Sequence, residues 1–199
     1  MKETQERIHS HHHAVQFYGN DESLVTTVAG FLSEGLVAAQ PAIIIATEAH
    51  STAIVAQLSA RFIDVRHAQE TGDLLLLDAS EALAEFMVGD MPDATAFEEY
   101  FGRIVKRMLN GRVRTVVRAY GEMVDLLWKD GRTEAAIRLE ILWNKLATAY
   151  QFALLCGYAM GAFYKQAEQF QDICRQHTHV LDTDTNIVVL ESKRGVRSA

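Results

Sequence analysis

The sequence contains no Gly-Lys pair, so it has no phosphate-binding P-loop. Such a loop needs glycines for close backbone approach to the phosphates, followed by a lysine and a serine or threonine. The first turn of the chain reads GNDES at residues 19–23, and its two acidic side chains would repel a phosphate. The G-x-G-x-x-G fingerprint of dinucleotide-binding folds is also missing. We therefore expect no nucleotide cofactor, and we expect the protein not to be an enzyme.

Cysteine, positive charge and long apolar runs are scarce as well. The two cysteines, Cys156 and Cys174, are too few for a disulfide framework or a thiolate metal site. The net charge of -7 argues against a nucleic-acid partner. The apolar runs AIIIA, LLLL and FALLC have the length of strands, and the polar start MKETQERIHSHHH lacks the apolar core of a signal peptide. These absences predict a cytoplasmic protein that binds neither nucleic acid nor membrane directly.

Short apolar runs alternate with helical patterns along the 199 residues. The predicted strands are 14–18, 42–46, 74–77, 115–120 and 152–158, with a terminal hairpin of 180–182 and 186–191. The predicted helices are 23–37, 51–62, 81–88, 95–110, 133–150 and 163–177. This alternation predicts a single three-layer α/β domain, in which helices cover both faces of a mainly parallel central sheet. The domain should span 11–192, between disordered segments 1–10 and 193–199.

Arg118 lies inside the apolar strand of the segment TVVRAYGEMVDLLW, residues 115–128. A buried charge is destabilising unless it is paired and hydrogen-bonded. We therefore expect Arg118 to be buried and to contact Asp78, Glu122 or Glu140. Arg118 could bind a polar group of a ligand. The alternative is a structural role, in which its ion pair fixes the strand register.

Polar side chains gather where the predicted parallel strands end. They are Tyr18, Glu48 and His50, Asp78, Arg118 with Tyr120 and Glu122, and finally Cys156 and Tyr158. Sheets of this kind bind ligands beyond the carboxyl ends of their strands. The sequence therefore predicts a ligand site at this edge of the sheet. Whether these side chains lie close together depends on the order of the strands in the sheet.

Cysteine and histidine offer two further chemistries. Cys156 could act as a nucleophile beside His50 or His177, but a cysteine within FALLC is more often an inert core residue. His177 and His179 could bind a metal only on an extended strand, and no carboxylate lies at ligand spacing. The tract 11–13 is interpreted as a frayed terminus that binds metal only adventitiously. We expect no catalytic residue and no metal site.

The helix over 133–150 places a second polar group beside aromatic residues. Glu140 and Asn144 are neighbours on one flank, because they are four residues apart. Helical spacing alone favours a Glu–Asn pair on a solvated edge, with Trp143 as ordinary core. The functional alternative is a polar pair beside a cavity walled by Trp128 and Trp143, which would suit a small apolar ligand.

Six blocks of the sequence together resemble a known family. They are HAVQFYGNDESL, AIIIATEAH, LLLLDASEALAEFM, RAYGEMVDLLW, LEILWNKL and LLCGYAM, which extend over about residues 11–180. Their order and spacing are similar to those of the MEDS domain, the methanogen/methylotroph sensory domain named from a regulator of dichloromethane metabolism. The resemblance implies a RecA/KaiC-like fold that has lost the phosphate loop. It also implies the sensing of small molecules such as hydrocarbon derivatives. The positions that match the family motifs are Tyr18, His50, Asp78, Arg118, Glu122, Glu140, Trp143 and Asn144.

Two functional hypotheses remain from the sequence. The first is a stand-alone sensory module that binds a small, largely apolar ligand and acts on a separate partner, such as a histidine kinase or a transcription regulator. Its ligand-binding residues would be the eight motif positions together with Tyr120 and Trp128. The second is a ligand-free scaffold that docks a partner or forms a homo-oligomer through a RecA-like surface. A cavity beside Arg118 would favour the sensor, and a filled interior would favour the scaffold.

Overall fold

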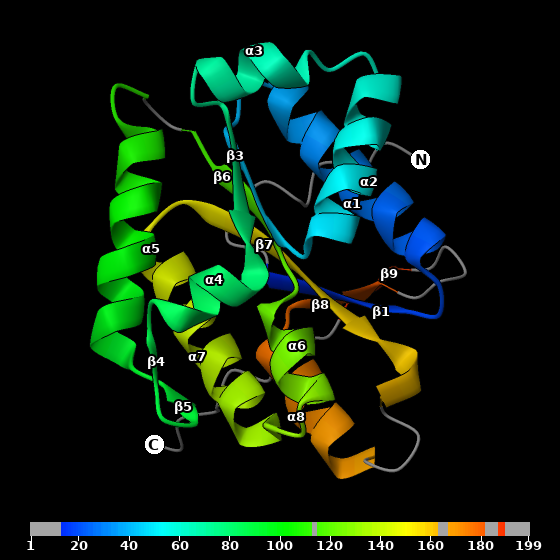
Figure 1. Cartoon of the computed structure of the whole chain (residues 1–199), viewed down its shortest axis with the longest axis vertical. Coiled ribbons are helices and arrows are strands. Elements are labelled where there is room, and N and C mark those ends of the chain that lie inside the picture. Colours follow the sequence, from blue (N-terminus) through cyan, green and yellow to red (C-terminus); the bar gives the residue numbers. More distant parts are fainter. Residues whose placement is uncertain (1–12, 113–114, 163–166, 182–186, 190–199) are drawn as a thin grey trace, which may run out of the picture.

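The computed structural model describes residues 13–112, 115–162, 167–181 and 187–189. Over these residues, strands and helices alternate around one central sheet (Figure 1). The segments 1–10 and 193–199, for which the sequence predicts disorder, lie outside the described residues. None of the helices in the described parts of the chain is long and apolar enough to cross a lipid bilayer.

The central sheet has the strand order β3-β2-β6-β7-β1-β8-β9. Its strands are β1 (His13–Tyr18), β2 (Ala42–Ala46), β3 (Leu74–Asp78), β6 (Val117–Gly121), β7 (Phe152–Ala159), β8 (His179–Leu181) and β9 (Ile187–Val189). Neighbouring strands run parallel, except that β8 and β9 form the antiparallel hairpin that the sequence predicts. The strands β3, β2, β6 and β7 are consecutive in the sheet, and the predicted mainly parallel α/β architecture is confirmed.

Helices cover both faces of this sheet (Figure 1). One face is covered by α1 (Asp21–Val37), α2 (Glu48–Ala60) and α3 (Val65–Glu70). The other face carries α4 (Ala79–Ala84), α5 (Ala94–Leu109), α6 (Met123–Lys129), α7 (Thr133–Ala149) and α8 (Ala167–Gln176). A small hairpin of β4 (Met87–Val88) and β5 (Met91–Pro92) lies between α4 and α5, and a 3-10 turn (Met160–Ala162) follows β7.

Side-chain caps fix the starts of several helices. The carboxylate of Asp78 accepts hydrogen bonds from the backbone N–H groups of Ser80 and Glu81, and Asp93 accepts one from Ala96. The Asn20 side chain accepts from Ser23 N at the start of α1. These bonds satisfy N–H groups that have no partner within the helix.

Several helices differ from the sequence predictions, and three cases show why. Helix α2 begins at Glu48 rather than near residue 51, because Thr47 is the extended capping residue. Helix α4 ends at Ala84 rather than at Val88, since the chain turns there into the β4–β5 hairpin. Helix α3 was not predicted, although Asp64 caps it through His67 N. Short elements of this size carry too little periodicity to be recognised from a single sequence.

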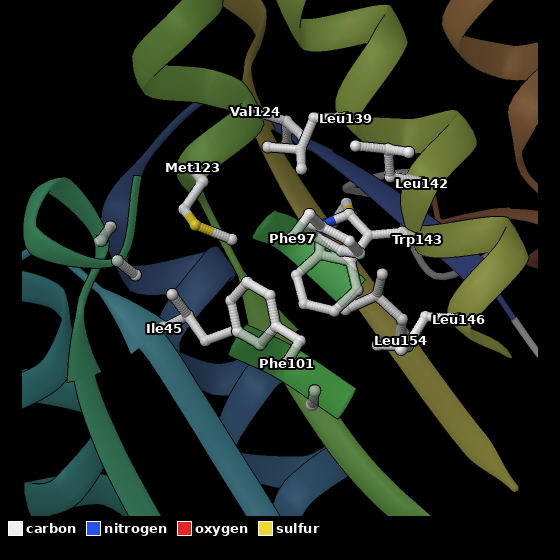
Figure 2. Close-up of a cluster of buried hydrophobic side chains, with 14 of the residues drawn as sticks. Ile45, Phe97, Phe101, Met123, Val124, Leu139, Leu142, Trp143, Leu146 and Leu154 are labelled. Carbon is white, nitrogen blue, oxygen red and sulfur yellow. The ribbon is translucent and has the colours of Figure 1, made fainter. Parts of the chain in front are cut away.

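Two apolar cores lie on opposite sides of the sheet. The larger one is built around the indole of Trp143, which contacts the rings of Phe97, Phe101 and Phe152 at centroid distances of 4.9, 4.5 and 5.7 Å (Figure 2). The smaller core packs α1 and α2 on the fully buried strand β2. Both cores hold the strand ends rigidly in place, which is the precondition for a site built at the edge of the sheet.

Candidate functional site

The carboxyl ends of β2 and β6 form a switch point in the topology. From β2 the chain passes into α2 on one face, whereas from β6 it passes into α6 on the other face. The two strands are direct neighbours, and Glu122 N continues their ladder by donating to Ile45 O at 3.1 Å. Open α/β sheets bind ligands in the crevice that such a divergence leaves.

Glu122 lies at this switch point and is almost completely buried. Its Oε1 accepts a hydrogen bond from Thr47 N at 2.5 Å, at the start of α2. Its Oε2 lies 2.5 Å from Nδ1 of His50 and accepts a hydrogen bond from the Tyr120 hydroxyl at 2.9 Å. A single carboxylate therefore links the end of β6 to α2.

A second carboxylate, Asp125, extends the set of contacts toward β1 and β7. Its Oδ2 accepts a hydrogen bond from the Tyr18 hydroxyl at 3.1 Å and lies 2.7 Å from Nζ of Lys129. Its Oδ1 accepts from Ala159 N at 3.0 Å. The ring of Tyr18 meets that of His50 edge to face, at 6.1 Å between centroids. Tyr18, His50, Tyr120, Glu122 and Asp125 thus form one group, which we term the carboxyl-end network.

Solvent reaches this network at its rim. Asp21, the first residue of α1, is 76% exposed at its side chain, and its Oδ1 lies 3.4 Å from Nε2 of His50. Lys129 is half-exposed. The charged groups that the network exposes to solvent are therefore the carboxylate of Asp21 and the ammonium group of Lys129.

The network shifts the pKa of its members in opposite directions. The hydrogen bond to Glu122 raises the pKa of His50 above its ordinary value. Burial alone would raise the pKa of Glu122, but hydrogen bonds from His50 and Thr47 bring it below the ordinary value. Burial, followed by the neighbouring carboxylates, raises the pKa of Tyr18 and of Tyr120. These shifts favour the charged forms of His50 and Glu122 and the neutral forms of both tyrosines.

Arg118 lies away from the network, at the other end of the sheet. It is the second residue of β6 and pairs with Ala42, the first residue of β2. Its guanidinium donates to Phe31 O and to Gln40 Oε1, both at 2.8 Å, and lies 3.5 Å from the exposed carboxylate of Glu34. The prediction that Arg118 is buried is confirmed. The prediction that it contacts Asp78, Glu122 or Glu140 is wrong, because four residues of strand place Glu122 about 13 Å further along.

Three other predicted site residues lie outside the carboxyl-end network. Asp78 is exposed at the end of the edge strand β3, where it caps α4. Trp143 is enclosed in the aromatic core. Trp128 is buried on α6 and packs edge-on against Tyr158, at 5.9 Å between ring centroids. The structure therefore fills the surroundings of Trp143 with side chains.

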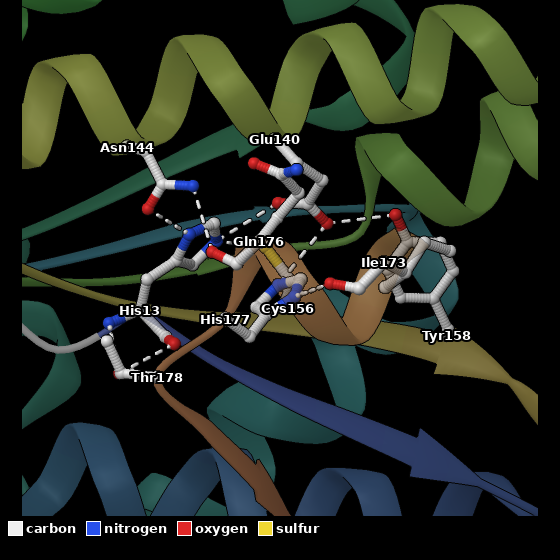
Figure 3. Close-up of polar contacts among 9 residues, drawn as sticks. All are labelled: His13, Glu140, Asn144, Cys156, Tyr158, Ile173, Gln176, His177 and Thr178. Carbon is white, nitrogen blue, oxygen red and sulfur yellow. Dashed lines mark hydrogen bonds and ion pairs between the residues drawn. The ribbon is translucent and has the colours of Figure 1, made fainter. Parts of the chain in front are cut away.

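Glu140 and Asn144 belong to a separate buried cluster on the α7 face (Figure 3). Both contact His13: Glu140 Oε2 lies 3.0 Å from Nε2, and Asn144 Oδ1 lies 3.0 Å from Nδ1. The Tyr158 hydroxyl donates to Glu140 Oε1 at 2.9 Å. The interpretation of a Glu–Asn pair on a solvated edge is wrong, because Glu140 has no exposed surface.

Sequence reasoning missed Asp125 and His13. Asp125 is a carboxylate within the apolar turn MVDLLW, and this anomaly was a signal that could have identified it. His13 was grouped with the histidine tract, but it starts β1 and alternates with the buried Val15 and Phe17. Strand periodicity, extended by one residue, would have placed it in the core.

Comparison with protein families gave one match, reported by its description as "MEDS: MEthanogen/methylotroph, DcmR Sensory domain", over residues 12–178. The match covers most of the chain and includes both polar clusters. Comparison with curated protein sequences gave no match. The family description is that of a sensory domain and names no reaction.

Proposed function

This chain belongs to the MEDS family of sensory domains, and from that premise we propose that it binds a small molecule at the carboxyl-end network and signals to a protein partner. The observation that carries the proposal is the convergence of Glu122, His50 and Tyr18 at the switch point between β2 and β6. The ligand is a small hydrocarbon derivative with one hydrogen-bonding or cationic group, such as a short alcohol or alkylamine. That group would interact with the exposed carboxylate of Asp21 at the rim.

Signalling requires that the ligand favour one of two states of the domain. Glu122 is the residue before α6, and its contacts with Thr47 and His50 tie α6 to α2 on the opposite face. A ligand that replaces one of these hydrogen bonds changes the contacts between α2 and α6. The partner would bind α2 or α6 and respond to this change. A histidine kinase or a transcription regulator is the partner class that fits a sensory domain.

A thermal-shift screen with short alcohols, alkylamines, carboxylates and haloalkanes tests the proposal. A ligand at ten times its Kd stabilises the folded state by about 1.4 kcal/mol. In a domain of this size, that corresponds to an increase in Tm of about 3–6 °C. Glu122→Gln and Tyr18→Phe should abolish or reduce the shift, since each removes a polar group of the network and keeps the side-chain volume.

Asp78→Asn is the matched control. It removes a carboxylate from the same edge of the sheet, outside the network, and should leave the shift unchanged. A shift that Asp78→Asn abolishes and Glu122→Gln leaves intact would contradict the proposed location. A screen without any shift, on protein that unfolds cooperatively, would contradict ligand binding.

The second candidate function is a ligand-free interaction scaffold. The specific observation in its favour is the filled interior: Trp143 is enclosed by aromatic rings, and the stem of Arg118 lies tight against Gly35 of α1. A scaffold would bind its partner equally well with and without every compound of the screen. A ligand-dependent change in partner binding separates the sensor from the scaffold.

A further inference from the structure

Four metal-ligating side chains meet in the buried cluster on the α7 face (Figure 3). His13 comes from β1, Glu140 from α7, Cys156 from β7, and His177 from the segment after α8. One ligand atom from each lies within 4.8 Å of the others, and all four residues are buried. None of these residues belongs to the carboxyl-end network.

Neighbouring groups aim the histidines inward. Asn144 Nδ2 donates to Gln176 O, so its Oδ1 faces His13 and accepts from Nδ1. His177 Nδ1 donates to Ile173 O at 2.8 Å. Each imidazole therefore presents Nε2 to the centre of the cluster. Histidines that bind metal ions are oriented in this way, with the second ring nitrogen held by an amide or a backbone carbonyl.

The Nε2 atom of His177 makes no hydrogen bond, although it is buried and points into the cluster. Its nearest charged neighbour is Glu140 Oε1 at 3.4 Å. A buried nitrogen without a hydrogen bond is unfavourable, and each such group calls for an explanation. A bound cation at the centre would provide its partner.

The spacings among the ligand atoms of His13, Glu140 and Cys156 are close to those around a tetrahedral ion, and the ligand atoms of all four residues lie within 4.8 Å of one another. Nε2 of His13 lies 3.0 Å from Glu140 Oε2 and 3.3 Å from Cys156 Sγ, and Sγ lies 3.5 Å from Glu140 Oε2. Bonds to zinc of about 2.0–2.3 Å at tetrahedral angles place the ligand atoms about 3.3–3.8 Å apart. The observed distances are close to this range.

We propose that His13, Glu140, Cys156 and His177 bind a divalent transition-metal ion, with Zn²⁺ the best match. Two neutral imidazoles, one carboxylate and one thiolate carry a charge of -2, so the ion neutralises the buried site. Cysteine sulfur, histidine nitrogen and carboxylate oxygen are all zinc ligands, and a zinc site with four protein ligands is closed and tetrahedral.

A metal here would connect segments that are distant in the sequence. It would join the start of β1 to α7, β7 and the segment between α8 and β8. Its effect would be on the integrity of the domain, so the proposed ligand site at the carboxyl-end network does not depend on it.

The test uses the full chain with His9, His11 and His12 replaced by alanine, since these residues could bind metal by themselves. The protein is purified without metal-affinity resin, stripped with a chelator and titrated with Co²⁺ or Zn²⁺. We expect one ion per chain and a higher Tm in the loaded form. Bound Co²⁺ should show tetrahedral d–d absorption and a thiolate-to-cobalt charge-transfer band.

Matched variants locate the site. Cys156→Ser should remove the charge-transfer band, whereas Cys174→Ser, which changes the other cysteine, should retain it. Asn144→Ala leaves all four ligands in place and should lower the metal affinity about 10–100-fold, because it releases the orientation of His13. This variant keeps the proposal testable if Cys156→Ser fails to fold.

Three outcomes would overturn the metal site. The first is a folded parent variant that binds no stoichiometric ion. The second is a charge-transfer band that survives Cys156→Ser. The third is Co²⁺ binding by the unmodified chain that disappears when His9, His11 and His12 are replaced, which would show adventitious binding by the tract.

Discussion

At the scale of single residues, Arg118 shows how a buried charge is accommodated without a buried counter-charge. Its guanidinium is bonded to a backbone carbonyl, to the Gln40 amide and to the exposed Glu34, and it lies over the ring of Phe31 at 5.1 Å from the centroid. The acidic side chains that the sequence predicted as its partners lie elsewhere. The partners of Arg118 therefore come from the end of α1, over seventy residues earlier in the chain.

Arg118→Ala should lower the free energy of unfolding by about 1–3 kcal/mol, because it leaves neutral acceptors without a donor. A larger loss of about 3–5 kcal/mol would be expected only if a buried carboxylate were stranded. Chemical denaturation measures the difference. Glu34→Ala, which removes the exposed partner, should cost less than about 1 kcal/mol.

Gly35 provides a second check on this arrangement. A Cβ atom at Gly35 would lie 2.5 Å from Cδ of Arg118, so only glycine leaves room for the arginine stem. Gly35→Ala should therefore destabilise the native chain more than it destabilises the Arg118→Ala variant. Equal losses in the two backgrounds would contradict the contact, since additivity indicates independent sites.

The His50–Glu122 pair predicts a pH-dependent stability. The pKa of His50 is raised above 6.5 in the folded state, so its contribution is complete below 6.5 and is lost as the pH rises through the folded value. The pKa of Glu122 is lowered below 4.5, so its contribution is present above 4.5 and is lost as the pH falls through the folded value. The pair should therefore stabilise the fold most between pH 4.5 and pH 6.5, the ordinary pKa values of the two groups.

Denaturation of the native chain and of His50→Gln at about pH 5.5 and about pH 8 tests the direction of this pH dependence. The difference in free energy of unfolding between the two proteins should be larger at the lower pH. In a Glu122→Gln background, replacing His50 should have little effect at either pH. A difference that grows toward pH 8 would contradict the pairing.

At the scale of elements, the N-terminus of α1 carries acidic side chains in its first turn. Asn20 caps the helix, and Asp21 and Glu22 occupy its first turn. A helix N-terminus attracts anions, but here its positive end is already neutralised by two carboxylates. Isothermal titration with Mg-ATP should show no binding in the micromolar range.

Asp21→Asn combined with Glu22→Gln should not restore ATP binding, because the chain still lacks the lysine of a P-loop. Binding that appears in this double variant would mean that the acidic side chains alone block the nucleotide. Binding by the native chain would overturn the prediction altogether.

The sequence predicted the large elements well and the small ones poorly. The apolar run of β2 and the long helices α1, α5 and α7 were recognisable, because their periodicity repeats over several turns or fills a whole strand. Helix α3 and the β4–β5 hairpin were not recognised. Their boundaries depend on capping and turn contacts that occupy only a few residues.

The site was predictable only in part, because it depends on register and strand order. Tyr18, His50 and Glu122 do converge at the carboxyl edge of the sheet, as their positions at strand ends suggested. Arg118 does not, since β6 begins at Val117 and places it near the opposite end. The buried cluster joins His13 to Glu140 and Cys156, each more than a hundred positions later in the chain, and no local pattern shows such contacts.

At the scale of the whole molecule, two polar clusters serve different parts of one sheet. The carboxyl-end network joins α2 to α6 at the switch point, where the surface is half-open. The cluster around Glu140 is buried and joins β1 to α7, β7 and the segment after α8.

The strand order also has a consequence for biosynthesis. β1 lies inside the sheet, and both of its neighbours, β7 and β8, come from the last third of the chain, so that His13 is paired with Leu154. During translation, β1 therefore has no partner strand until β7 has been made. Contacts of such large sequence separation slow folding and leave unpaired edges exposed. The nascent chain is consequently most prone to aggregation over the interval between the synthesis of β1 and that of β7.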